Sequence, residues 1–129
     1  MTISEVSKKY NLTEDTIRYY EKVGLIPKVP RNKSGIREFD DASCRWLEFV
    51  KCMRSAGMPI DALIKYINLT KEGEKTVKAR KELLINQREI LKQKQEEINN
   101  TIKRLDYKIA LYDEIEEGKR KDFSQEPWN

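Results

Sequence analysis

The most reactive side chains in this 129-residue chain are two thiols, Cys44 and Cys52, and the sequence contains no histidine. Structural zinc sites normally use about four cysteine or histidine ligands, so we expect neither a metal site nor a bound cofactor. The cysteines lie eight residues apart, which on a helix separates them by about 12 Å along the axis. A disulfide needs α-carbons within about 7 Å of each other, so no internal bridge is expected.

The sequence also lacks the other groupings typical of enzymes. It has no glycine-rich phosphate-binding loop and no cluster of carboxylates beside a base or nucleophile. Catalytic sites are assembled from such groups. We therefore expect a binding protein and not an enzyme.

Positive charge is concentrated between residues 18 and 37. The net charge of the whole chain is +4, whereas this segment alone carries six basic residues against one acid, Glu21. The basic residues are Arg18, Lys22, Lys28, Arg31, Lys33 and Arg37. A local excess of this kind favours a polyanionic partner, and nucleic acid is the common one. From these residues alone, a solvated helix face followed by a surface loop remains an open alternative.

Two short helices are predicted to position this charge. Residues 2–5, TISE, form a capping-box pattern that opens the first helix. Thr13 is placed to cap the second helix, and two acidic residues follow it at the positive end of the helix dipole. This helix is expected to run to about Val23, with Gly24 ending it in the left-handed conformation. Two such helices joined by a tight turn predict a helix-turn-helix.

The helical period separates the second helix into two faces. Ile17 and Tyr20 fall on the inner face, while Arg18, Tyr19 and Lys22 fall on the outer face. An outer face with two basic residues and a tyrosine is a candidate for lying in a DNA groove.

The turn-rich residues after Pro27 are followed by the alternating stretch 36–39, IREF, which predicts a small β-hairpin, or wing, beside the helices. A helix capped by Asp40 is then expected to reach about Ala56, with Trp46, Phe49, Val50 and Met53 as its core stripe. Another helix starts near Pro59. The architecture is therefore all-α with a small β-hairpin wing.

A much longer helix is predicted from about residue 74 to residue 117, which contain no proline or glycine. Apolar residues recur there at heptad spacing, and the predicted seam consists of Leu84, Leu91, Ile98, Ile102, Leu105, Ile109 and Tyr112. A head of about 70 residues offers too little surface to bury this stripe, so we expect a homodimer through a coiled coil. A monomer whose long helix folds along its own head is the alternative.

The composition agrees with one small head and an appended charged helix, because 38% of residues are hydrophobic and 37% are charged. The predicted division is a DNA-binding head at 1–70, a dimerisation helix at 71–118 and a short charged tail at 119–129, in which Phe123 and Trp128 are expected to fray. With no apolar run of membrane-spanning length and no signal peptide, we expect a cytoplasmic protein.

Together these motifs resemble the MerR family of bacterial transcription regulators. The resemblance covers about residues 2–117, and its most specific parts are TIRYYE at 16–21 with Gly24 and Leu25, then Arg37, then AGM at 56–58. Phe39 stands where the family often has tyrosine, so a phenol-to-phosphate bond from that position is absent. The resemblance implies a winged helix-turn-helix head and an antiparallel coiled-coil homodimer. It also implies binding to a pseudo-palindromic promoter operator of double-stranded DNA, which the dimer bends and untwists for RNA polymerase.

The family's DNA contacts map onto Arg18 and Tyr19 on the second helix and onto Arg37 on the wing. Thr16 belongs to the same motif. Tyr20 is a weaker match, because its ring is expected against the core with only the hydroxyl outside. Lys22 and Lys33 join the predicted DNA-binding set through charge and position.

Residues 49–54, FVKCMR, resemble the aldehyde-responsive branch of the family, which implies that Cys52 is a sensor thiol. With the stripe around Val50 taken as the inner direction, Cys44 is expected to point away from the core and Cys52 to lie on its flank. Two alternatives stay open. One is the same regulator with a non-covalent ligand or protein trigger, and the other is a coiled-coil adaptor whose basic patch meets an acidic protein.

Overall fold

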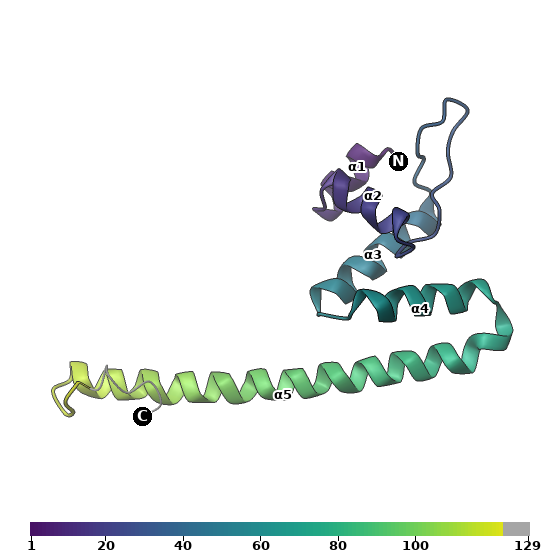
Figure 1. Ribbon diagram of the computed structural model, residues 1–129. Helices are drawn as coiled ribbons and strands as arrows, with labels where there is room; N and C mark the ends of the chain where they lie inside the picture. Colours follow the sequence, from purple (N-terminus) through teal and green to yellow (C-terminus); the bar gives the residue numbers. More distant parts are fainter. Residues whose placement is uncertain (123–129) are drawn as a thin grey trace. The chain divides into compact units, whose positions relative to one another are not determined.

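The computed structural model describes residues 1–122 and divides the chain into two units, Met1–Gln87 and Arg88–Asn129. The elements in order are α1 (Ile3–Tyr10), α2 (Glu14–Lys22), α3 (Asp41–Ser55), α4 (Ile60–Lys71), a 3-10 turn η1 (Glu74–Thr76) and α5 (Val77–Glu116) (Figure 1). Helix α5 begins in the first unit and provides most of the second. The predicted helical order is confirmed, while Phe123 and Trp128 lie outside the described residues.

The first two helices begin where the capping residues predicted. The Thr2 hydroxyl accepts a bond of 3.1 Å from the Glu5 amide, and the Glu5 carboxylate accepts one of 3.1 Å from the Thr2 amide. At the start of α2, Thr13 Oγ1 accepts from the Thr16 amide at 3.1 Å. Gly24 has φ of +83°, a left-handed conformation that glycine adopts readily, so α2 ends where the sequence predicted.

One apolar cluster joins α1, α2, α3, α4 and the connecting segment 25–39. Each helix contributes one face: Val6 from α1, Ile17 from α2, Leu47 and Val50 from α3, Leu63 and Ile67 from α4, with Leu25, Ile26, Val29, Phe39 and Met58 between them. All of these side chains are at most 3% exposed. Burial on this scale stabilises the fold by about 1.5–3 kcal/mol per large aliphatic or aromatic side chain. The core therefore fixes α2 against the rest of the head.

The predicted β-hairpin is not confirmed. Residues 1–122 contain no strand, and the wing segment shows one isolated antiparallel bridge between Arg31 and Arg37. Pro30 has no amide hydrogen to extend the pairing, and Ile36 is exposed, so no buried face favours a longer ladder. The segment is a loop wing, closed by the bridge and by a bond from the Glu38 amide to the Pro30 carbonyl at 2.7 Å.

The predicted core stripe of α3 was partly wrong. Its buried face consists of Ser43, Leu47 and Val50, whereas Trp46, Phe49 and Met53 are half-buried around it. The large aromatic side chains suggested a buried face of α3 that is rotated about the helix axis from the observed one, by roughly the angle between successive residues. Leu47, which is fully buried, defines the face that packs on the core.

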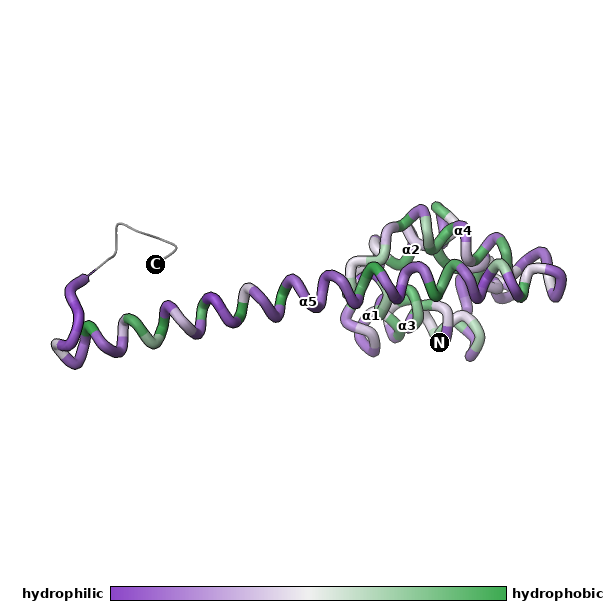
Figure 2. Tube along the Cα trace, turned by 90° about the horizontal axis from the view of Figure 1, so that it is seen from below, coloured by the Kyte–Doolittle hydropathy of each residue, from purple (hydrophilic) through white to green (hydrophobic). Residues whose placement is uncertain are grey.

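Helix α5 carries a long series of exposed apolar side chains. Hydrophobic residues alternate with hydrophilic ones along its length (Figure 2). Within the predicted seam, Leu84 and Leu91 are half-buried, while Ile98, Ile102, Leu105, Ile109 and Tyr112 are exposed. Ile98 is 60% and Leu105 is 55% exposed in the single chain. Such a repeat of large apolar side chains in water is typical of a helix that pairs with another helix.

Candidate nucleic-acid interface

The outer face of α2 carries the residues expected to meet DNA. Arg18, Tyr19 and Lys22 are exposed, and Tyr19 keeps 46% of its surface in solvent. The opposite face is anchored by Ile17, which is 1% exposed. Tyr20 is half-buried against the core cluster, in the orientation that the helical period predicted. The structure therefore separates a fixed inner face from an accessible outer face on the same two turns of helix.

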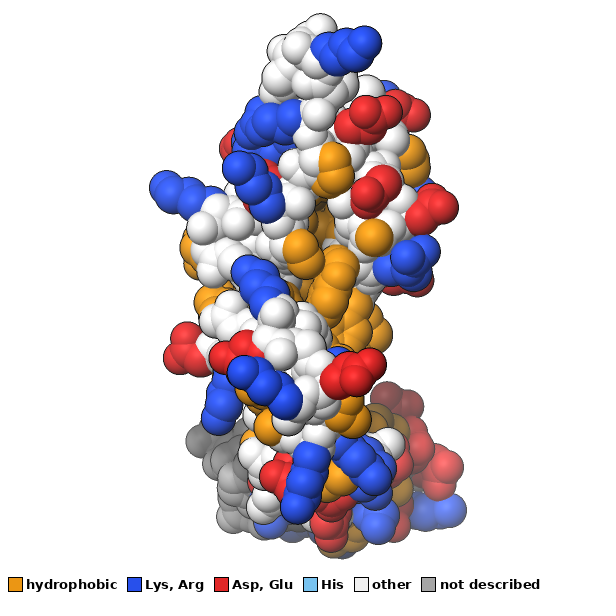
Figure 3. Space-filling view, turned by 90° about the vertical axis from the view of Figure 1, so that its right-hand side faces the viewer, with side chains coloured by type: hydrophobic (Ala, Val, Ile, Leu, Met, Phe, Trp, Pro, Cys, Tyr) orange, Lys and Arg blue, Asp and Glu red, His pale blue; other side chains and the backbone are white. Residues whose placement is uncertain are grey.

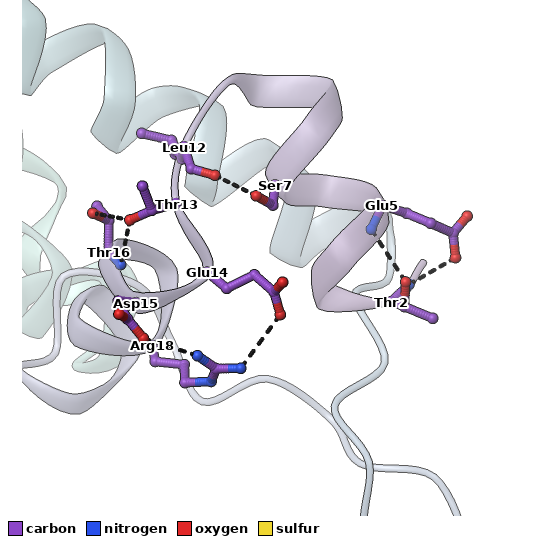
Figure 4. Close-up of polar contacts among 9 residues, drawn as sticks. All are labelled: Thr2, Glu5, Ser7, Leu12, Thr13, Glu14, Asp15, Thr16 and Arg18. Atoms are coloured by element: carbon purple, nitrogen blue, oxygen red, sulfur yellow. Dashed lines mark hydrogen bonds and ion pairs between the residues drawn. The ribbon is translucent and has the colours of Figure 1, made fainter.

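The guanidinium of Arg18 is held by two acidic residues of its own helix (Figure 4). Arg18 donates to the Asp15 carboxylate at 3.1 Å and to the Glu14 carboxylate at 3.3 Å. All three side chains are well exposed, so these ion pairs add little stability and can be exchanged for other partners. Beside them, Thr16 is half-buried, and its hydroxyl accepts a bond of 2.7 Å from the Thr13 hydroxyl. Thr16 therefore belongs to the cap of α2 in the unbound protein.

The wing is ordered by its own polar groups. Asn32 Oδ1 accepts bonds from the amides of Ser34 at 2.9 Å and Ile36 at 3.1 Å, and Arg31 donates to the Gly35 carbonyl at 2.6 Å. Lys33 sits exposed at the turn. In the upper part of Figure 3, Lys and Arg side chains lie mainly on one side and Asp and Glu side chains on the other. Arg31 and Lys33 are the exposed basic residues of the wing itself.

Arg37 behaves differently from the other basic residues of the segment. Its Nε donates to Glu21 Oε1 at 2.7 Å, and the two side chains are only 25% and 12% exposed. The other carboxylate oxygen of Glu21 accepts from the Val29 amide at 2.6 Å. Burial raises the pKa of Glu21, but the bonds from Arg37 and Val29 and the charges of Arg37 and Arg31 outweigh it, so the net pKa is lowered.

Glu21 is the residue of this site that the sequence interpretation missed. Glu21 is the one acid in a basic segment, and that isolation is the signal that could have identified it. A single carboxylate among six basic residues has several possible ion-pair partners, and the sequence does not say which one it takes.

The two thiols lie in different environments on α3. Cys52 is exposed, on the side of the helix opposite the buried residue Val50, so the prediction that it lies on the flank of the core stripe was wrong. Cys44 is half-buried against the core cluster, so the prediction that it points away from the core was wrong, for the same reason that the core stripe was misplaced. Cys44 also lies near the Tyr10 hydroxyl, whose pKa is raised by burial and further by the thiol. Of the two, Cys52 is the accessible nucleophile.

A shallow aromatic groove begins one helical turn before Cys52. It has a volume of about 260 Å³ and is lined by Ala42, Arg45, Trp46, Phe49 and Tyr66. The ring of Phe49 packs edge-on against Trp46 with centroids 5.9 Å apart and lies 5.5 Å from the ring of Tyr66. Phe49 precedes Cys52 by three residues on α3, and Cys52 is not among the residues that line the groove.

Two comparisons with family models decide the relationship of this chain to known proteins. Residues 1–70 match the model of the MerR HTH family regulatory protein, and residues 44–107 match the model described as MerR, DNA binding. The chain belongs to the MerR family. It is a DNA-binding transcriptional regulator of the MerR type, and its α1–α2 pair is the helix-turn-helix.

Individual relatives agree with this assignment. The chain is 53% identical over 91 residues to the HTH-type transcriptional regulator AdhR of Bacillus subtilis, a match that covers 70% of this chain and 65%, less than two thirds, of that relative. A crystal structure described as a MerR family regulator from Listeria monocytogenes superposes with a TM-score of 0.85 at 48% identity, covering 88% of this chain and 86% of the other. The structure of HiNmlR, a MerR family regulator lacking the sensor domain and bound to promoter DNA, gives a TM-score of 0.82 at 30% identity, with 89% and 91% covered.

Within residues 1–122, no group of three or more cysteine, histidine, aspartate or glutamate side chains is placed to hold a metal ion. In the same part of the chain, no helix combines the length and apolar character needed to span a bilayer.

Proposed function

We propose that this MerR-type regulator binds a pseudo-palindromic promoter operator as a homodimer, distorts it, and is switched by reactive aldehydes through Cys52. The DNA face assigned by this proposal consists of Arg18, Tyr19 and Lys22 on α2 with Lys33 and Arg37 on the wing. Thr16 and Tyr20 contribute at its edge. Exposure of the first four side chains around a fixed helix supports this assignment.

The dimer in this proposal forms through α5. The apolar series from Ile98 to Tyr112 is exposed in the single chain, and pairing it with a second copy removes this surface from water. Two heads joined in this way reach two half-sites of an operator. Bending a duplex costs about 1–10 kcal/mol, which the paired protein contacts can repay. As the family resemblance implies, the distorted DNA then presents its two promoter elements to RNA polymerase at a usable spacing.

The single observation that carries the switch is the exposure of Cys52 within the stretch FVKCMR. A cysteine thiolate adds to the carbonyl carbon of an aldehyde, forming a carbon–sulfur bond while the carbonyl π pair moves to oxygen. That oxygen takes a proton from water, and the product is a hemithioacetal. No oxidant or reductant is needed, and the reverse reaction restores the thiol.

A second candidate trigger is a small apolar ligand bound non-covalently. The aromatic groove formed by Trp46, Phe49 and Tyr66 favours it, because stacked rings in an open groove accept a flat apolar molecule. The two triggers are separated by the chemistry of the response, because only the covalent one needs the thiol of Cys52.

Selection of genomic fragments bound by the purified chain, followed by a promoter reporter with and without a reactive aldehyde, tests the proposal. We expect enrichment of a palindrome inside a promoter spacer and a several-fold change in output after aldehyde is added. A shift of about 1–3 kcal/mol between two dimer shapes is sufficient for such a change. Fragments without a palindrome would contradict the dimeric operator, and a reporter that ignores aldehydes would contradict the switch.

A further inference from the structure

The wing is ordered internally, and the Glu21–Arg37 pair links it to α2. Within the wing, the bonds to Asn32 and the Arg31–Arg37 bridge fix the loop as one piece. Such a loop keeps its shape, but those bonds do not set its angle to the helix. The bond from Arg37 Nε to Glu21 Oε1 does cross from the base of the wing to the last turn of α2.

Glu21 makes a second connection at the same place. Its Oε2 accepts from the amide of Val29, a fully buried residue in the segment that leads from α2 into the wing. One carboxylate therefore holds the helix, the connecting segment and the wing together. Both partners of the ion pair are largely withdrawn from solvent, where charge-assisted bonds of this kind are strong and geometrically specific.

This geometry competes with a direct role of Arg37 on DNA. A guanidinium whose Nε is committed to an internal carboxylate has its charge largely compensated. The pair together adds no net charge to the surface that a phosphate meets. Lys33 on the same wing is exposed, and no acidic partner for it was found among the described residues.

We infer that Glu21 and Arg37 are positioning residues that set the wing against the recognition helix, and that Lys33 supplies wing charge to the DNA backbone. The inference rests on the proposed operator binding. It replaces the expectation that Arg37 contacts DNA directly. Glu21 is not among the residues predicted to contact DNA, but under this inference specific DNA binding requires it.

The two roles of Arg37 predict opposite effects for Glu21→Gln. This substitution keeps the size of the side chain and removes one negative charge near the DNA. If Arg37 binds phosphate, removing its competitor strengthens DNA binding. If the pair positions the wing, the substitution loosens the wing and weakens specific binding by about tenfold, the scale of a contacting pair in a mutant cycle.

The experiment measures operator binding by full-length wild type, Glu21→Gln, Arg37→Gln and the double variant over a range of salt concentrations. We expect each single variant to lose about tenfold in operator affinity. The double variant should lose no more affinity than the single variant that binds the operator more weakly. The salt slope should stay near that of wild type in all three. Lys33→Gln should instead lower the slope by about one phosphate contact.

Glu38→Gln is the matched control. It removes a carboxylate from an exposed position beside Arg37, with the same change in charge and no loss of the Glu21 bonds. It should bind the operator at least as well as wild type. Thermal melting of each variant ensures that binding is measured on folded protein, and Arg37→Gln still tests the pair if Glu21→Gln does not fold.

Tighter binding by Glu21→Gln, or a salt slope lowered by one contact in Arg37→Gln, would overturn the inference while leaving the proposed operator binding intact. Additive losses in the double variant would overturn it as well, because independent contacts add. A wild-type chain that bound no operator would overturn the proposed function together with the inference.

Discussion

Nη1 of Arg18 lies 3.1 Å from Oδ1 of Asp15, one turn earlier on α2, on the face that the other exposed basic residues share. The arginine is therefore oriented before any DNA arrives, and an acidic neighbour compensates its charge. Exposed pairs of this kind contribute little to folding. Their importance lies in binding, where a base edge or a phosphate must replace the carboxylate.

Arg18→Ala should weaken specific operator binding by about 1–3 kcal/mol, the range for an arginine that reads a base edge. Asp15→Asn should have the opposite sign, because it removes a competitor of the DNA without removing the arginine. Electrophoretic mobility shifts on operator and on scrambled DNA separate the two effects. Equal binding by wild type and Arg18→Ala, with folding intact, would show that α2 does not present this face to DNA.

The local signals that placed Arg18 were reliable because they act over one or two turns. A threonine and a glutamate three residues apart formed the predicted capping box, and Gly24 ended α2 by its own conformational freedom. Contacts between residues far apart in the sequence were harder to predict. The partner of Glu21 is sixteen residues away, and no local rule selects Arg37 from the basic residues around it. The α3 stripe was misread because aromatic side chains resemble core residues even where they line an open groove.

Glu21 should also make the head sensitive to acid. Its pKa is lowered from an ordinary value of 4.5 in the folded protein, so its contribution to stability is complete above the unfolded pKa and is lost as the pH falls through the folded one. Below about pH 5, wild type should lose melting temperature faster than Glu21→Gln. Thermal scans from pH 7 to pH 3 check this. Parallel curves for the two proteins would mean that other carboxylates dominate acid unfolding.

The α5 seam provides a test of the proposed dimer. Leu105→Asp places a carboxylate at a seam position that is 55% exposed in the single chain and buried in a paired coiled coil. An unpaired buried charge costs several kcal/mol, so we expect monomers by light scattering and weaker operator binding. Asn100→Asp introduces the same charge two residues before Ile102, off the seam, and should remain dimeric. If Leu105→Asp stayed dimeric, the interface would have to lie on another surface.

The switch is tested by the contrast between the two cysteines. Cys52 is exposed on α3, so an adduct there changes a surface that a partner helix or ligand can contact. Cys44 is half-buried against the core and is poorly placed to meet an aldehyde.

Cys52→Ser keeps the size of the side chain and loses the nucleophile. We expect this variant to bind the operator normally and to lose the several-fold response of the promoter to aldehyde, whereas Cys44→Ser responds like wild type. Thiol alkylation with and without the aldehyde, followed by mass spectrometry, should show that the aldehyde slows the labelling of Cys52. A Cys52→Ser protein that still responds would refute the thiol mechanism and favour a non-covalent ligand in the groove, for which Phe49→Ala is then the informative variant.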